Sequence, residues 1–263
     1  IDLDHCRSIE REEMLAYRGI ITDKISKYMM ANGYVLSPKS KSYHALDSFV
    51  YEYVNCGGTK DNLKIEINYM LRCHVLPVAR REVRLPWNEE KLTVFSVAPL
   101  EIFASKTVAL LTRTAPRDLY DMHNMVKIGL FDESEEAMLR KCVVFYSAIG
   151  SAQPPEKFEL DNIGNVSFRQ IKRDLNSVLR KGERFDLEFV QKEVKDYLTS
   201  VLVPTKEEKL FWKAFSEGNY YPNWVFGDSD EFRNVAKHPM ALWKCRDKEE
   251  DKKPLDKDHE KRV

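Results

Sequence analysis

Three carboxylates on two short segments are the side chains of this sequence best suited to chemistry. Residues 63–69 (LKIEINY) alternate apolar and polar side chains, the pattern of a β-strand with one buried face, and Glu66 lies on the polar face. Residues 1–4 (IDLD) alternate in the same way, with Asp2 and Asp4 on the polar face. If both strands share one sheet and one core, the three carboxylates project from the same side and repel one another unless a cation binds or a pKa rises. The plainer alternative is that these acidic residues only solvate the outer face of the sheet.

Carboxylates from an early strand and a later strand suit the transfer of a phosphoryl or nucleotidyl group with two Mg²⁺ ions. Such ions activate the attacking hydroxyl and stabilise the leaving pyrophosphate. A nucleotide substrate also needs fixed cations for its phosphates, and Lys106, Arg113 and Arg117 could supply them. Lys106 and Arg113 are seven residues apart and therefore lie on the same face of a helix. Taken alone, Lys106 is also explained as a lysine whose aliphatic stem packs along an amphipathic helix while its ammonium stays in water.

The composition is that of a charge-rich globular protein. The chain has 263 residues, of which 43% are hydrophobic and 32% charged, and its 42 basic and 42 acidic residues give a formal net charge of zero. This balance argues against non-specific binding of nucleic acid and leaves room for a local basic groove. Five scattered cysteines without a CxxC pair predict reduced thiols rather than a disulfide framework or a zinc site. Without a signal peptide or an apolar run of the ~20 residues that cross a membrane, we expect a cytoplasmic protein.

The segments that position the candidate residues begin with strands and continue as helices. The expected elements are a helix over residues 8–31, strands over 45–54, 63–69, 83–87 and 92–97, and helices over 99–113, 116–126 and 134–147. Two of these helices begin at a proline, which is favoured in the first turn. Asp118 and Asp121 are three residues apart and therefore neighbours on the second of these two helices.

Beyond a Gly/Pro-containing boundary at residues 150–155 the pattern is almost entirely helical. The expected elements there are helices over 168–180, 186–201, 205–217 and 239–245, with an aromatic loop over 219–228. Residues 246–263 carry charges of both signs and almost no apolar side chains, which predicts a disordered tail. The fold class is therefore α+β, with a mixed β-sheet domain over residues 1–149, a helical C-terminal domain over 150–245, and the charged tail.

Three motifs, taken in order, resemble a known family. They are residues 63–68 (LKIEIN), residues 99–106 (PLEIFASK), and Arg113 with residues 117–121 (RDLYD). Over about residues 1–130 they resemble the AbiEii/AbiGii nucleotidyltransferase toxins of abortive-infection toxin–antitoxin systems, a form of phage defence. The resemblance implies a polymerase β-like nucleotidyltransferase core and Mg²⁺-dependent transfer of a nucleotide from an NTP to an acceptor. For related toxins this acceptor is the 3′ end of tRNA, and a cognate antitoxin is the implied protein partner.

The resemblance assigns the carboxylates to a metal site. It implies that Asp2, Asp4 and Glu66 are Mg²⁺ ligands, with Asp2 and Glu66 also counted as catalytic residues. In the family, a Gly-Ser turn and a first carboxylate come before this strand. We therefore expect both upstream of Ile1, so that the sequence begins inside the nucleotidyltransferase core. Glu66 is supported twice, by the phase of its strand and by the family motif.

The resemblance assigns the helix residues to the nucleotide. It implies Lys106 and Asp118 as catalytic residues, and Lys106, Arg113, Arg117 and Asp121 as nucleotide-binding residues. Arginines and lysines between residues 169 and 195 could contact an RNA backbone. Acidic residues are interleaved in the same segment, so a solvated helix face explains it equally well.

Two other functions compete with this one. A metal-dependent nuclease of the restriction-endonuclease type uses an Asp and a strand-borne Glu, with a lysine two residues after the Glu. Here Lys64 precedes Glu66 and Asn68 stands where that lysine is required, which disfavours a nuclease. A non-catalytic nucleotidyltransferase-like scaffold that binds a protein partner is the other alternative. The residues before Ile1 distinguish it, because a Gly-Ser turn and an Asp there favour the enzyme.

Overall fold

The computed structural model describes residues 10–44, 46–69, 71, 73–85, 88–177, 179–180 and 182–251. The chain divides into two compact units, Ile1–Cys73 with His238–Met240 and His74–Lys237 with Ala241–Val263. The expected strand at residues 1–4 lies outside the described residues, and so do its carboxylates Asp2 and Asp4. The α+β class is confirmed, because strands dominate the first part of the chain and helices the rest. Every strand pair in the described ranges is antiparallel.

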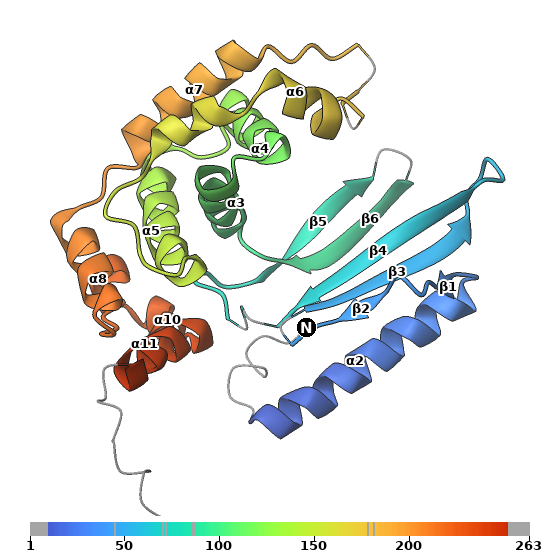
Figure 1. Ribbon diagram of the computed structural model, residues 1–263, viewed down its shortest axis with the longest axis horizontal. Coiled ribbons are helices and arrows are strands. Elements are labelled where there is room, and N and C mark those ends of the chain that lie inside the picture. The colour runs from blue at the N-terminus through green and yellow to red at the C-terminus, as the bar shows by residue number, and fades with distance from the viewer. Residues whose placement is uncertain are drawn as a thin grey trace, which may run out of the picture. The chain divides into compact units, whose positions relative to one another are not determined.

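β3 (Leu46–Val54) is the central strand of the first unit (Figure 1). The strands that pair with it are β1 (Val35–Leu36), β2 (Lys41–Ser42) and β4 (Lys60–Asn68). The β3 residues that pair with β1 or β2 also pair with β4. The two short strands therefore lie along one edge of β3, and β4 lies along the other. Gly58 in the turn between β3 and β4 has φ of 75°, which glycine adopts without strain. The predicted strands over residues 45–54 and 63–69 therefore pair as an antiparallel hairpin.

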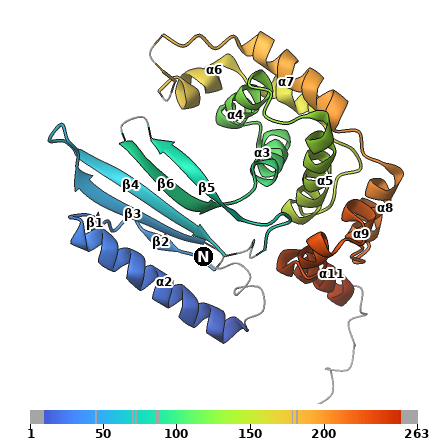
Figure 2. The same ribbon diagram turned by 180° about the vertical axis from the view of Figure 1, so that it is seen from behind.

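α2 (Arg11–Ala31) covers one face of this sheet (Figure 2). The buried side chains between them are Met29, Phe49, Tyr51, Ile67 and Tyr69. The alternation predicted for β4 is confirmed, because Ile67 and Tyr69 face this core while Lys64 and Glu66 are exposed. The phase of the strand thus places Glu66 on the face that points away from α2.

The second unit begins with a hairpin of β5 (Ala79–Leu85) and β6 (Asn88–Ser96). Its longer helices are α3 (Pro99–Arg113), α4 (Pro116–Lys127), α5 (Glu133–Gly150), α7 (Leu187–Val201) and α8 (Lys206–Ser216). The shorter pieces are a 3-10 turn (Leu160–Asn165), α6 (Phe168–Gln170), a π turn (Ile171–Leu175), α9 (Asn223–Phe226), a second 3-10 turn (Asp230–Phe232) and α10 (Arg233–Ala236). The last helix of the described residues is α11 (Pro239–Asp251). No helix in the described part of the chain has the length and apolar character needed to cross a membrane.

The C-terminal half of α5 is buried on all sides. Every residue from Cys142 to Ile149 is buried, the pattern of a helix at the centre of a helical layer. The Phe145 ring packs against Phe211 of α8 and Phe226 of α9, with ring centroids 6.5 and 5.7 Å away. α3 packs along α5 as well, so α5 is the support on which α3 rests.

Three sequence expectations for the helical region need correction. The helix expected over residues 168–180 is too long, because the helical segment consists of α6 followed by the π turn and ends at Leu175. Arg117 Nε donates to the Asp174 carbonyl oxygen at 3.2 Å, which occupies an acceptor that a longer helix would use. The aromatic loop over residues 219–228 contains α9, where Val225 and Phe226 are buried. α11 continues to Asp251, past the residue 245 at which we expected helical structure to end.

Candidate active site

α3 and α4 form a helical hairpin that carries the candidate nucleotide-binding residues. Each helix has a proline in its first turn, where the missing N–H removes no helical hydrogen bond. Thr114 ends α3 in a left-handed conformation with φ of 48°, and α4 begins at Pro116. The C-terminal part of α3 is thereby placed beside the N-terminal part of α4. The sequence prediction of both helices is confirmed.

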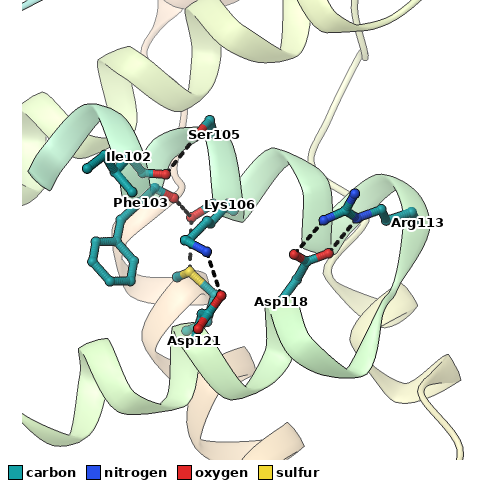
Figure 3. Close-up of polar contacts among 9 residues, drawn as sticks. Ile102, Phe103, Ser105, Lys106, Arg113, Asp118 and Asp121 are labelled. Atoms are coloured by element: carbon teal, nitrogen blue, oxygen red, sulfur yellow. Dashed lines mark hydrogen bonds and ion pairs between the residues drawn. The ribbon is translucent and has the colours of Figure 1, made fainter. Parts of the chain in front are cut away.

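Arg113 and Asp118 form a two-pronged ion pair across this turn (Figure 3). Arg113 Nε lies 2.6 Å from Asp118 Oδ2, and Arg113 Nη2 lies 2.7 Å from Asp118 Oδ1. The Asp118 side chain is 4% exposed and that of Arg113 is 66% exposed. The hydrogen bonds that Arg113 donates to Asp118 raise the pKa of Arg113 further, so the guanidinium stays charged. Its Nη1 group has no hydrogen-bond partner in the described part of the chain.

Lys106 and Asp121 form a second ion pair, about two helical turns before Arg113 on α3 and about one turn after Asp118 on α4. Lys106 Nζ lies 2.5 Å from Asp121 Oδ2, and each side chain is 36% exposed. Figure 3 shows this pair on the same side of the two helices as the Arg113–Asp118 pair. The four side chains carry two positive and two negative charges, so the group is neutral before any ligand binds. A phosphate at Lys106 must therefore compete with Asp121 for the ammonium.

Arg117 does not join these two pairs. Its Nε donates to the Asp174 carbonyl oxygen, 57 residues further along the chain. The structure thus brings Lys106, Arg113, Asp118 and Asp121 together in the second unit, and it directs Arg117 toward the π turn.

Glu66 belongs to the first unit. It stands opposite Ser48 in the β3–β4 register, and its Oε1 lies 2.7 Å from Lys64 Nζ. The Glu66 side chain is 49% exposed, and an ion pair between two exposed side chains contributes little to stability. Its carboxylate is therefore accessible to a ligand. In the described ranges no three His, Cys, Asp or Glu side chains lie close enough to hold a metal ion, and Asp2 and Asp4 are outside those ranges.

Comparison with protein families identifies the chain. A family model described as nucleotidyl transferase AbiEii toxin, type IV TA system, matches residues 2–205. The chain belongs to the AbiEii family. The matched segment contains the strand of Glu66 and the whole α3–α4 hairpin, so the AbiEii motifs lie on the elements described above. No curated protein and no solved structure matches the chain significantly.

Glu101, inside the AbiEii motif on α3, is a buried residue that the sequence analysis did not single out. Its carboxylate accepts the backbone N–H groups of Val75 and Leu76 at 3.0 Å each and the hydroxyl of Tyr146, and His74 Nδ1 lies 3.0 Å away. Burial alone would raise the pKa of Glu101, but these hydrogen bonds outweigh it and lower the pKa below the usual 4.5.

This anchor ties the N-terminal end of α3 to residues 74–76 and to α5. The sequence gives one sign that Glu101 is buried. It lies three residues before Ala104 and therefore falls on the buried face of the helix. A carboxylate at a core position of an amphipathic helix requires hydrogen-bond donors, and the sequence does not show where those donors come from.

A second buried carboxylate, Asp47, organises the first unit. It accepts hydrogen bonds from Ser42 Oγ, from the Tyr69 hydroxyl at 2.8 Å and from Arg18 Nη2 at 3.0 Å. Burial alone would raise the pKa of Asp47, but these bonds and the charge of Arg18 lower it. The Arg18 guanidinium also lies 4.0 Å above the centre of the Tyr69 ring. This cluster ties α2 to the sheet that carries Glu66.

Proposed function

We propose that this AbiEii-family chain transfers a nucleotide from an NTP to the 3′ end of an RNA, with tRNA as the acceptor and Mg²⁺ as the cofactor. The observation that carries the proposal is the pairing of Lys106 and Arg113 with Asp121 and Asp118 on one hairpin, inside the segment that matches the family. In this reaction the acceptor hydroxyl attacks the α-phosphorus of the NTP, a new P–O bond forms, and pyrophosphate leaves.

The carboxylates supply the metal site of the proposal. Oxygen donors from Asp and Glu are the ligands that Mg²⁺ takes in proteins, and Glu66 fits this role because its carboxylate is accessible. Asp2 and Asp4 complete the proposed set, and we count Asp2 and Glu66 as catalytic residues. Bound Mg²⁺ would lower the pKa of the attacking hydroxyl and offset the charge of the phosphates.

The α3–α4 hairpin supplies the proposed nucleotide site. Lys106 and the Nη1 group of Arg113 bind the phosphates of the nucleotide in this proposal. The Nη groups of Arg117 bind them as well. Asp121 accepts a hydrogen bond from the nucleotide once Lys106 has turned to a phosphate. Asp118 holds the Arg113 guanidinium in the orientation that contacts the reacting phosphates. Lys106 and Asp118 are the residues of this group whose loss should lower the rate of transfer most.

In this proposal the protein is a toxin that acts on translation. The family description names type IV toxin–antitoxin systems, so we propose a cognate antitoxin as the protein partner. We place the activity in the cytoplasm, which is consistent with the free thiols of Cys56 and Cys142. We assign the transfer to residues 1–149 and propose residues 150–245 as a helical domain that contacts the acceptor.

The test is incubation of the full-length protein with Mg²⁺, each labelled NTP in turn and total tRNA. Glu66→Gln removes the proposed ligand charge, and Asp61→Asn is the matched control because Asp61 is an exposed carboxylate on the same strand. We expect label in RNA with the native protein and with Asp61→Asn, and none with Glu66→Gln. RNA that becomes shorter would establish a nuclease instead, and unlabelled, intact RNA with every NTP would overturn the proposal.

A further inference from the structure

α2 carries one line of exposed residues on the face that points away from the sheet. Its members, spaced by three or four positions along the helix, are Glu12, Ala16, Gly19, Asp23 and Lys27. Met29, on the face toward the sheet, belongs to the buried core instead. In the first unit, Figures 1 and 2 show the sheet on one side of α2 and no described element of that unit on the other. We call these five residues the outer line of α2.

Gly19, in the middle of the outer line, is not required by the fold of a single chain. It lies inside α2, it is not among the glycines with a positive φ, and a Cβ at this position would have no neighbour within 4 Å. Glycine inside a helix destabilises it relative to alanine, because the unfolded chain has more freedom to lose. What the missing side chain allows is a close approach of another backbone to α2.

Ile20, next to Gly19, exposes an apolar side chain on the same side of the helix. It is 53% exposed, although burying apolar surface is favourable. The small side chains of Ala16 and Gly19 lie beside it, so the middle of α2 offers a shallow apolar patch on which a second helix can pack closely.

The charges of the outer line are arranged to suit a second copy of the same helix. Glu12 lies seven residues before Gly19, and Lys27 lies seven residues after Ile20. A twofold axis that passes between Gly19 and Ile20 therefore brings Glu12 of each copy opposite Lys27 of the other, with the two helices antiparallel. Within one chain, Glu12 and Lys27 are separated by about 22 Å along the helix and cannot meet.

An ion pair already present on α2 leaves Lys27 available for this contact. Lys27 Nζ lies 2.7 Å from Asp23 Oδ2, and the two side chains are 76% and 58% exposed. An ion pair this exposed is weak, because water screens it. Glu12 of a second copy would extend it into a row of alternating charges.

We propose that two copies of this chain associate through the outer line of α2, with the helices antiparallel and crossing at Gly19 and Ile20. The contact buries Ala16 and Ile20 and pairs Glu12 with Lys27 at both ends. One pair of helices is a small interface, so the dimer is weak and forms as the protein concentration rises. The association does not depend on nucleotide transfer.

Sedimentation velocity of the full-length protein, from low to high micromolar concentration, measures the association. Glu12→Lys and Lys27→Glu each place like charges at both ends of the contact, so each variant alone should raise the dimer Kd by about tenfold or more. An equimolar mixture of the two variants should dimerise like the native protein, because every contact in the mixed dimer joins opposite charges. A charge effect within one chain cannot produce this recovery.

The matched control is a second pair of charge reversals, Glu133→Lys and Lys192→Glu. Glu133 lies in the first turn of α5 as Glu12 does in that of α2, and Lys192 makes an exposed ion pair with Asp196 as Lys27 does with Asp23. Both control variants should dimerise like the native protein. Thermal melting verifies that all four variants are folded.

Gly19→Gln tests the crossing point through two effects of opposite sign. Glutamine favours a helix more than glycine does, so the variant should melt at a higher temperature at low protein concentration. Its side chain stands where the two helices meet, so the variant should dimerise more weakly. A native protein that stays monomeric at every concentration would overturn the inference. An equal loss of dimer in the control variants, a mixture no more dimeric than its components, or a Gly19→Gln dimer as strong as the native one would do the same.

Discussion

The Arg113 guanidinium and the Asp118 carboxylate meet through two hydrogen bonds of 2.6 and 2.7 Å across the turn between α3 and α4. Asp118 is almost completely buried and Arg113 is mostly exposed. A buried carboxylate thus fixes one edge of an exposed guanidinium and leaves its Nη1 free for a ligand. Because the fork geometry needs both nitrogens, a lysine cannot reproduce it.

Arg113→Lys should therefore weaken nucleotide binding more than it weakens the fold. The lysine keeps the charge but makes a single contact to Asp118, so we expect the KM for NTP to rise several-fold. The exposed position limits the loss of unfolding free energy to about 1 kcal/mol or less. Steady-state kinetics and urea denaturation give the two numbers. Arg246→Lys on α11 is the control, and an unchanged KM in Arg113→Lys would contradict a role in phosphate binding.

Glu101→Gln should destabilise the protein strongly. The amide cannot accept four hydrogen bonds from Val75, Leu76, Tyr146 and His74, and it places an N–H₂ group among donors. Removing the charge from such a buried cluster costs about 3 kcal/mol of unfolding free energy. Urea denaturation at pH 7 measures it, with the exposed Glu133→Gln as the control. A loss below about 0.5 kcal/mol would show that the Glu101 carboxylate is not the anchor of α3.

The same carboxylate predicts a pH dependence. The hydrogen bonds hold the pKa of Glu101 below the 4.5 of a free glutamate, so the folded state favours the ionised form. Its contribution to stability is therefore complete above about pH 4.5 and is lost as the pH falls through the lower pKa of the folded state. The difference in unfolding free energy between the native protein and Glu101→Gln should shrink as the pH falls below about 4.5. A difference that grows on acidification would contradict the assignment.

Tyr69→Phe should change the alkaline behaviour of the first unit. Burial, with the hydrogen bond to Asp47, raises the pKa of Tyr69 to about 12, above the usual 10.0 of a tyrosine. The stabilisation linked to this hydroxyl is present below about pH 10 and is lost as the pH rises toward 12, because the unfolded chain ionises first.

Difference absorbance of the phenolate band, native minus Tyr69→Phe, should show one tyrosine titrating near pH 12. At pH 7 the variant should lose about 1 kcal/mol of unfolding free energy, because Asp47 loses one donor and keeps Ser42 and Arg18. A phenolate appearing near pH 10 would show that the Tyr69 hydroxyl is not held by Asp47.

Local patterns in the sequence were sufficient for most of the elements but not for their partners. The period of two in residues 63–69 placed Glu66 on the correct face of β4, because side-chain direction along a strand depends on backbone geometry alone. Prolines and flanking residues marked the starts of α3 and α4 for a similarly local reason.

Contacts between distant residues were missed. Glu101 finds its donors 25 to 27 residues earlier in the chain and at Tyr146, 45 residues later, and Arg117 donates to the Asp174 carbonyl oxygen 57 residues later. No periodicity records such pairings, since they depend on how elements pack. The same limit applied to charge, because counting Lys106 and Arg113 as free cations overlooked the carboxylates of Asp121 and Asp118 that neutralise them.

Lys106 and Asp121 offer the sharpest test of the hairpin as a nucleotide site. If the 2.5 Å ion pair is the state that an incoming phosphate must break, Asp121→Asn should free the ammonium and bind NTP more tightly, whereas Lys106→Met should bind it more weakly. Both variants should lower the rate of transfer, since each removes a group that contacts the bound nucleotide. Calorimetric titration with a non-hydrolysable NTP measures affinity apart from rate. If both variants lose NTP affinity equally, the ion pair only holds α3 against α4. An affinity that rises in Asp121→Asn and falls in Lys106→Met would instead show that Asp121 competes with the phosphate for Lys106.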